Sequence, residues 1–177
     1  MRILAICLRL CLPLAICVAS ASVRAEPEWI IAQPSDELRF TDLSFGAVFD
    51  GGYGFGLTPG IHMGIPLLNG GFIPSINDSF YLEPGILLGA RFRRHARDLL
   101  WVIPEIGPRW NFHLTPNWDA FASIKLGWAI GRQGDFWIRG VVGVLWWFAP
   151  NWALRLETAH GAVVGQGGYL GLSYRFM

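Results

Sequence analysis

The chain has 177 residues, enough for one domain with a sizeable core, and a formal net charge of +1 that gives no indication of nucleic-acid binding. It is 53% hydrophobic but only 15% charged, with a mean hydropathy of +0.38, whereas soluble domains have about 25% charged residues. After the N-terminal stretch, no apolar run approaches the ~20 residues that a membrane-spanning helix needs. Hydrophobicity spread in this way is typical of a transmembrane β-barrel.

Residues 1–25 have the pattern of a secretory signal peptide. Arg2 supplies the positive start, and residues 3–18 form an apolar body that Arg9 interrupts. We favour cleavage after Ala25; Ala19-Ser20-Ala21 is the alternative. Lipidation is disfavoured because Ile16 stands before Cys17, where a lipoprotein needs a small residue. The exported chain would then contain neither a disulfide nor a thiol nucleophile, since all the cysteines lie in this segment, at positions 7, 11 and 17.

The remaining chain divides into residues 26–37, an irregular periplasmic lead-in with two prolines, and a barrel over residues 38–177. Alternation of apolar with polar or small residues indicates strands over 43–49, 53–65, 80–92, 100–113, 119–130, 136–148, 152–157 and 169–176. Asp50-Gly51-Gly52 and residues 93–98, 132–135 and 162–168 are predicted turns or loops, and residues 69–79 a long connection. The sequence therefore predicts an all-β, antiparallel up-and-down barrel of eight strands. Ten strands are the alternative if Thr58-Pro59-Gly60 is itself a turn, since proline weakens a strand prediction.

The two faces of these strands differ in a way that indicates which one is outside. Many glycines share the charged face, where the crowded lumen of an eight-stranded barrel needs small residues. Tryptophans gather at strand ends, as a lipid headgroup belt requires. The charged face should therefore point into the lumen, where opposite charges can pair. The lumen charges so predicted are Glu83, Arg91, Glu105, Arg109, Asp119, Lys125, Arg139, Arg155, Glu157 and Arg175.

Two turns share the dipeptide Pro-Asn, at Pro116-Asn117 and Pro150-Asn151. Both are flanked by aromatic residues, including Trp147, which we expect to lie in the interfacial belt. They are similar to periplasmic turns of small barrels that look like the OmpA-type transmembrane domain. The last strand resembles the closing strand of the outer-membrane β-barrel family, whose signature the barrel assembly machinery recognises. Its positions are filled by Tyr169, Gly171, Tyr174 and Phe176, although Met177 follows the Phe that in the family usually ends the chain.

The resemblance implies an integral protein of the outer membrane, and we expect it to be a monomer. Its partners would be outer-membrane lipids including lipopolysaccharide and, during biogenesis, the assembly machinery and periplasmic chaperones. A lumen filled by charge pairs favours a structural or binding role without an open pore. Alternatives are a lipid A-modifying enzyme and a soluble periplasmic ligand-binding barrel, in which the apolar face would line the interior.

Few residues suggest chemistry. Lipid A deacylases of this architecture carry a His-x-Ser-Asn motif, but His160 is followed by Gly161-Ala162-Val163, so the nucleophile is missing. Asp78-Ser79 weakly resembles part of the His, Asp and Ser set of palmitoyl-transfer barrels, but we interpret it as a turn. We expect His62 and His113 to be hydrogen-bond partners in the lumen and His160 to face outward. No catalytic residue, cofactor site or metal site is predicted. The basic residues Arg93, Arg94 and Arg97 could bind lipopolysaccharide phosphates or simply form a solvated loop.

Overall fold

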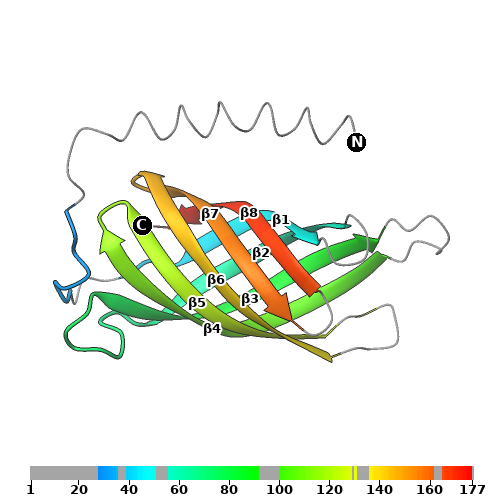
Figure 1. Ribbon diagram of the computed structural model, residues 1–177, viewed down its shortest axis with the longest axis horizontal. Coiled ribbons are helices and arrows are strands. Elements are labelled where there is room, and N and C mark those ends of the chain that lie inside the picture. The colour runs from blue at the N-terminus through cyan, green and yellow to red at the C-terminus, as the bar shows by residue number, and fades with distance from the viewer. Residues whose placement is uncertain are drawn as a thin grey trace.

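The computed structural model is a closed antiparallel barrel in which each strand pairs with its neighbours in chain order and β8 closes onto β1 (Figure 1). The structure describes residues 28–35, 39–50, 56–91, 100–128, 130, 136–161 and 165–176. The predicted fold class and the eight strands are confirmed. The strands are β1 (Asp42–Asp50), β2 (Gly56–Leu68), β3 (Asp78–Arg91), β4 (Leu100–Thr115), β5 (Trp118–Trp128), β6 (Phe136–Ala149), β7 (Trp152–Gly161) and β8 (Gly165–Arg175).

The prolines of β2 do not divide it. Pro59 pairs with Ala47 of β1, and the strand continues to Pro66, beyond which the register with β3 shifts. A bulge is one of the places where a sheet tolerates proline, because the missing donor is then not needed by the ladder. The ten-strand alternative, which needed a turn at Thr58-Pro59-Gly60, is therefore wrong.

Both ends of the barrel sequence, the start of β1 and the finish of β8, lie at one end of the barrel, which we call the terminal end (Figure 1, left). The connections 69–77, 116–117 and 150–151 are at the same end. The segment 28–35 lies beside them: the amide of Ile30 donates to the carbonyl of Leu114 at 2.9 Å, and the amide of Asn77 donates to that of Ile31 at 2.7 Å.

The predicted long connection ends two residues early. Asp78 and Ser79 are the first residues of β3, paired with Phe112 and Asn111 of β4, and are not part of a turn. Gly71 in the connection has φ +61°, and a side chain there would collide with the Asp78 carboxylate. That carboxylate accepts hydrogen bonds from the Phe72 amide and the Trp110 indole, so it holds the connection against the barrel.

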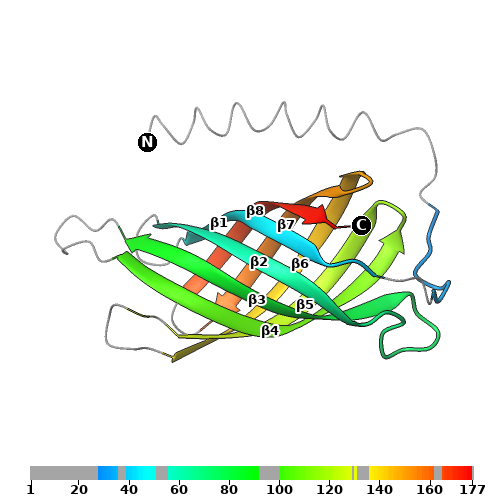
Figure 2. The same cartoon turned by 180° about the vertical axis from the view of Figure 1, so that it is seen from behind.

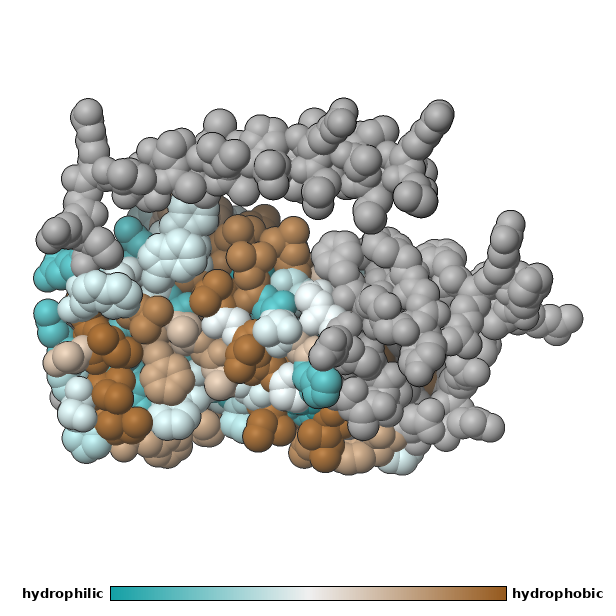
Figure 3. Space-filling view, in the orientation of Figure 1, coloured by the Kyte–Doolittle hydropathy of each residue, from teal (hydrophilic) through white to brown (hydrophobic). Residues whose placement is uncertain are grey.

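The apolar face of the strands is outside. Ile61 and Ile124 are 56% and 57% exposed, whereas Glu83 and Lys125 are 0% exposed. Side chains of β5 alternate along its whole length, and apolar residues cover much of the visible wall (Figure 3). Strands β1 to β4 form the far side of the barrel (Figure 2), and they too carry exposed apolar residues such as Phe45, Ile86 and Ile106. None of the described residues belongs to a helix that is long and apolar enough to cross a membrane.

Candidate functional site

The centre of the lumen is a single carboxylate, Glu83, which three cations share. The ammonium group of Lys125 and the Arg155 guanidinium, at 2.8 Å, contact its Oε1 atom, and Arg109 Nη1 donates to Oε2 at 2.8 Å. The four side chains come from β3, β5, β7 and β4. They meet because strand alternation points each of them inward at a similar level of the barrel.

Further carboxylates balance this excess of positive charge. Arg109 also pairs with Asp42 of β1, and Arg155 with Glu157 of its own strand. Glu105 accepts from Arg139 and contacts His62 Nε2 at 2.7 Å, and its Oε1 atom lies 3.9 Å from Lys125 Nζ.

Two hydroxyl groups bring the remaining strand into the network. Ser44 Oγ of β1 accepts a hydrogen bond from Arg155 Nη1 at 3.0 Å and is hydrogen-bonded to Ser173 Oγ of β8 at 2.6 Å. One continuous network of ion pairs and hydrogen bonds therefore receives a side chain from each of the eight strands.

Aromatic rings and glycines pack around the network. The Arg109 guanidinium lies 4.5 Å from the centre of the Tyr81 ring, and that of Arg155 lies 4.8 Å from the Phe121 ring, distances at which cation–π attraction contributes. A Cβ atom added to Gly85 would stand 2.2 Å from His62 Cδ2, and one at Gly64 would stand 2.6 Å from Arg109 Nη2. Glycine at these positions makes room for the network.

Apolar layers lie on both sides of the charges, and the sequence analysis missed them. Toward the end opposite the termini, Val48, Leu87, Ile103 and Tyr169 form a buried cluster. A second cluster comprises Phe121, Val141, Leu145, Trp147, Ala153 and Ala159; all but Ala159 lie on the terminal side of the charged network residues of their own strands. The signal was present, because Val141, Leu145 and Trp147 occupy the same parity as Arg139. The lumen is therefore layered.

At the terminal end a serine, a histidine and an aspartate form a chain of hydrogen bonds. Ser79 Oγ is 2.8 Å from His113 Nε2, and His113 Nδ1 is 2.7 Å from Asp119 Oδ1. These are the residue types and connections of a nucleophilic triad. A nucleophile also needs a place for the reacting atom, however, and Ser79 is 0% exposed. The arrangement is better suited to tying β3, β4 and β5 together.

Trp147 completes this chain and corrects one expectation. Its indole donates to Asp119 Oδ2 at 2.8 Å, and the Arg175 guanidinium stacks 3.7 Å from its ring centre. Trp147 thus faces the lumen and is not part of an interfacial belt. Its neighbours on the outward parity do form one at the terminal end. Trp118 and Trp146 stack with ring centres 5.9 Å apart, and Trp152 lies 4.9 Å from Tyr174.

The structure places most of the site residues that the sequence suggested. Buried inside the barrel are Glu83, Glu105, Arg109, Asp119, Lys125, Arg139, Arg155 and Glu157, while Arg175 is half-buried. His62 and His113 are also inside, and His160 is exposed on the outer wall. The side chain of Arg91, and the residues Arg93, Arg94 and Arg97, lie outside the described part of the chain.

The closing-strand residues divide between the two faces. Tyr169 is buried in the lumen, with its ring centre 5.6 Å from that of His62, and Gly171 lies beneath it: an added Cβ would meet the tyrosine ring at 2.6 Å. Tyr174 and Phe176 face outward, and their ring centres are 5.2 Å apart.

Similar folds are known among solved structures. The outer-membrane protein Ail of Yersinia pestis, in a phospholipid bilayer nanodisc, matches with a TM-score of 0.55 and 11% identity over 78% of this chain and 100% of that one. The N-terminal β-barrel domain of Pseudomonas aeruginosa OprF matches with a TM-score of 0.51 and 16% identity, over 78% of this chain and 100% of that domain. A designed transmembrane β-barrel matches with a TM-score of 0.53 and 13% identity, over 80% of this chain and 100% of the designed chain.

The fold is that of a small outer-membrane barrel. At these identities the likeness concerns the fold alone, and the predicted location in the outer membrane agrees with what the natural neighbours are. No family model matches the sequence, and no curated protein matches it.

Proposed function

We propose that the chain is an integral outer-membrane barrel with a structural or binding role, whose lumen is closed to ions. The observation that carries this proposal is the network around Glu83, because it joins all eight strands across the lumen. Eight strands leave an interior that side chains can fill. An ion crossing it would have to separate buried pairs and so leave uncompensated charges. The apolar layer of Val48, Leu87 and Ile103 adds a second barrier that excludes water.

The orientation of the wall supports the membrane location. A soluble ligand-binding barrel would line its interior with the apolar face, whereas here that face is outside and the charges are inside. The tryptophans at the terminal end fit a headgroup belt, and the Pro-Asn turns there fit the periplasmic side. Fractionation of cell membranes, followed by gel mobility with and without heating, tests this location. Recovery in the soluble periplasmic fraction would contradict it.

Planar-bilayer recording tests the closed lumen. Purified, refolded protein should give no defined single-channel current, while a porin reconstituted in the same way serves as the positive control. A reproducible unitary conductance would overturn the proposal of a closed lumen, whatever the membrane fractionation shows.

We propose a non-enzymatic role, and two features support it. His160 lacks the neighbouring serine and asparagine of the deacylase motif, and the Ser79 hydroxyl is enclosed. Lipid A should therefore have the same mass in cells that lack the protein and in cells that overproduce it. A mass difference equal to one acyl group would favour the lipid-modifying alternative.

The expected partners are lipopolysaccharide, the barrel assembly machinery and periplasmic chaperones, and we expect the barrel to be a monomer. Guanidinium groups suit phosphate, so Arg93, Arg94 and Arg97 are proposed contacts for lipopolysaccharide. Replacing all three by Ala should reduce the lipopolysaccharide that copurifies with the protein. Unchanged retention would show that these arginines form a solvated loop.

A further inference from the structure

His160 is an anomaly on the outer wall. It is exposed on β7, above Leu156 and Thr158 on the same outward parity, and it pairs with Gly140 of β6. Nearby outward residues such as Ile138 and Val142 are apolar. An imidazole among apolar neighbours on a lipid-facing wall offers a hydrogen-bonding group to a lipid.

The imidazole stands at one end of a groove. The groove has a volume of about 480 Å³, and its wall includes Phe80, Trp110, Ile124, Val142, Thr158 and His160. It follows a row of paired residues across the sheet, from Phe80 and Trp110 through Ala122 and Val142 to Thr158. The row crosses from β3 to β7, and four steps of about 4.8 Å between strands give a length of about 19 Å.

The groove is open beside the histidine because Gly140 has no side chain. A Cβ atom built there would meet only the His160 carbonyl oxygen, at 4.0 Å, so packing does not require glycine. This contrasts with the lumen glycines, whose added Cβ atoms would collide with their neighbours. Gly140 thus leaves space on the outer wall beside the imidazole.

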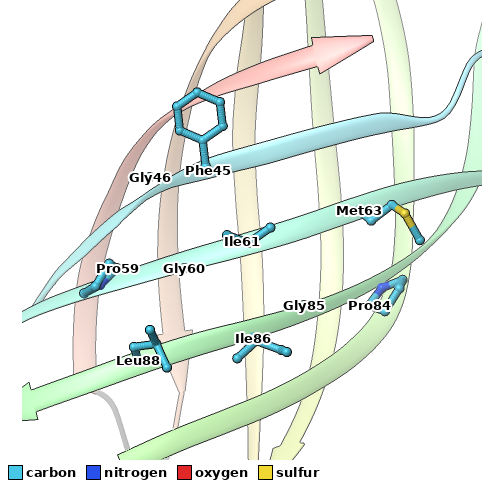
Figure 4. A pocket seen from close by; sticks show the side chains of 10 residues that line it. All are labelled: Phe45, Gly46, Pro59, Gly60, Ile61, Met63, Pro84, Gly85, Ile86 and Leu88. Atoms are coloured by element: carbon cyan, nitrogen blue, oxygen red, sulfur yellow. The ribbon is translucent and has the colours of Figure 1, made fainter. Parts of the chain in front are cut away.

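A second groove on the wall shows what a purely apolar surface looks like. It is larger, about 670 Å³, and lies over β1, β2 and β3 (Figure 4). Its side chains, among them Phe45, Ile61, Met63, Ile86 and Leu88, carry no N–H or O–H group (Figure 4). Only the groove at His160, of these two, combines an apolar floor with a polar end.

The polar end lies in the outer half of the membrane. Trp152, in the belt at the terminal end, is eight residues below His160 on β7. At a rise of about 3.3 Å per residue and a strand tilt of about 40°, this places the imidazole ~20 Å above the belt. The apolar band of such barrels is about 25 Å tall, so His160 lies near the level where acyl chains join their headgroups.

We propose that this groove binds one acyl chain of a lipopolysaccharide molecule, and that His160 and Thr158 hydrogen-bond the oxygens at the chain's headgroup end. Lipopolysaccharide fits because it occupies the outer leaflet and because its hydroxylated acyl chains offer hydroxyl and ester oxygens to the two polar side chains. The inference rests on the membrane location and orientation given under the proposed function. It concerns the outer wall and is independent of whether the lumen conducts.

Native mass spectrometry of the refolded barrel, titrated with purified lipopolysaccharide in detergent micelles, tests the proposal. His160→Phe should lower the affinity about three- to tenfold, the effect of one lost hydrogen bond. Gly140→Leu, which fills the groove, should lower it more than about tenfold. Ile61→Phe is the control: Ile61 is exposed on the same outer wall but lines the second groove, so a bulkier side chain there should leave the affinity unchanged.

Heat-modifiable gel mobility establishes that each variant is folded. Wild-type affinity in both His160→Phe and Gly140→Leu would overturn the proposal. Equal retention of phosphatidylglycerol, with the same sensitivity to both substitutions, would assign the groove to phospholipid and overturn the choice of lipopolysaccharide. A single-channel current in planar bilayers would contradict the closed lumen but would leave these affinities unchanged, so the two proposals fail separately.

Discussion

Replacing Glu83 by Gln tests the network at the carboxylate that contacts three cations. Gln keeps the size of Glu and one carbonyl oxygen but removes the charge that three cations contact. Arg109 would retain Asp42, and Arg155 would retain Glu157. Lys125 would retain only Glu105, whose Oε1 atom is 3.9 Å from its ammonium group. The substitution therefore leaves the buried ammonium group of Lys125 without a close carboxylate.

Removing one partner of a buried ion pair typically costs about 3–5 kcal/mol, because the other charge stays uncompensated. We expect a loss of this size in the free energy of unfolding. Adding Lys125→Met to the Glu83→Gln variant removes the stranded charge and should recover about 2–3 kcal/mol, since replacing a whole buried pair by apolar groups is often nearly neutral. Glu157→Gln is the control: its partner Arg155 keeps Glu83, so the loss should be smaller.

The measurement is urea-induced unfolding in phospholipid vesicles, followed by tryptophan fluorescence and approached from both the folded and the unfolded state. If the double variant is less stable than Glu83→Gln, the reasoning is refuted. Lys125 would then contribute through packing, and the charges of the lumen would not act as a mutually dependent set.

Further predictions concern the closing strand, the lumen and the enclosed serine. Phe176→Ala should reduce the amount of folded barrel in outer-membrane fractions, whereas deletion of Met177 should not; equal assembly of the two variants would contradict the resemblance of the closing strand. Gly85→Val should lower the free energy of unfolding by at least about 1–3 kcal/mol by overpacking the lumen, and Gly140→Val, on the open outer wall, should be nearly neutral. A fluorophosphonate probe should leave Ser79 of the folded barrel unlabelled; labelling detected by peptide mass spectrometry would show an accessible nucleophile.

The strand count and the two faces could be predicted from the sequence because period-two alternation is a local property. In β2 the alternation predicted one continuous strand, whereas Pro59 suggested a turn. Pro59 pairs with Ala47 of β1, so the strand is continuous there. The start of β3 could not be predicted, because Asp78 and Ser79 look like turn residues. They are strand residues only because β4 and the Trp110 indole pair with them.

The site was less predictable, since it depends on contacts between residues far apart in the chain. Parity gave the inward charges, but it could not show that Glu83 is shared by Lys125, Arg109 and Arg155, which come from three other strands. Trp147 looked interfacial because it flanks a Pro-Asn turn. Its parity, shared with Arg139, points it inward, and the register of β6 with β5 then brings its indole to Asp119.

The participation of every strand in the network has a consequence for the order of assembly. Ser173 joins the network only when β8 pairs with β1. The backbone pairing of Asp42 with Arg175 belongs to the same β1–β8 seam. A barrel that lacks its last strand would leave the interior open to water, and water would solvate charges such as Arg155 and Glu83 until closure. We therefore expect dehydration of the interior and formation of the final seam to be one cooperative event, late in folding and slow to reverse.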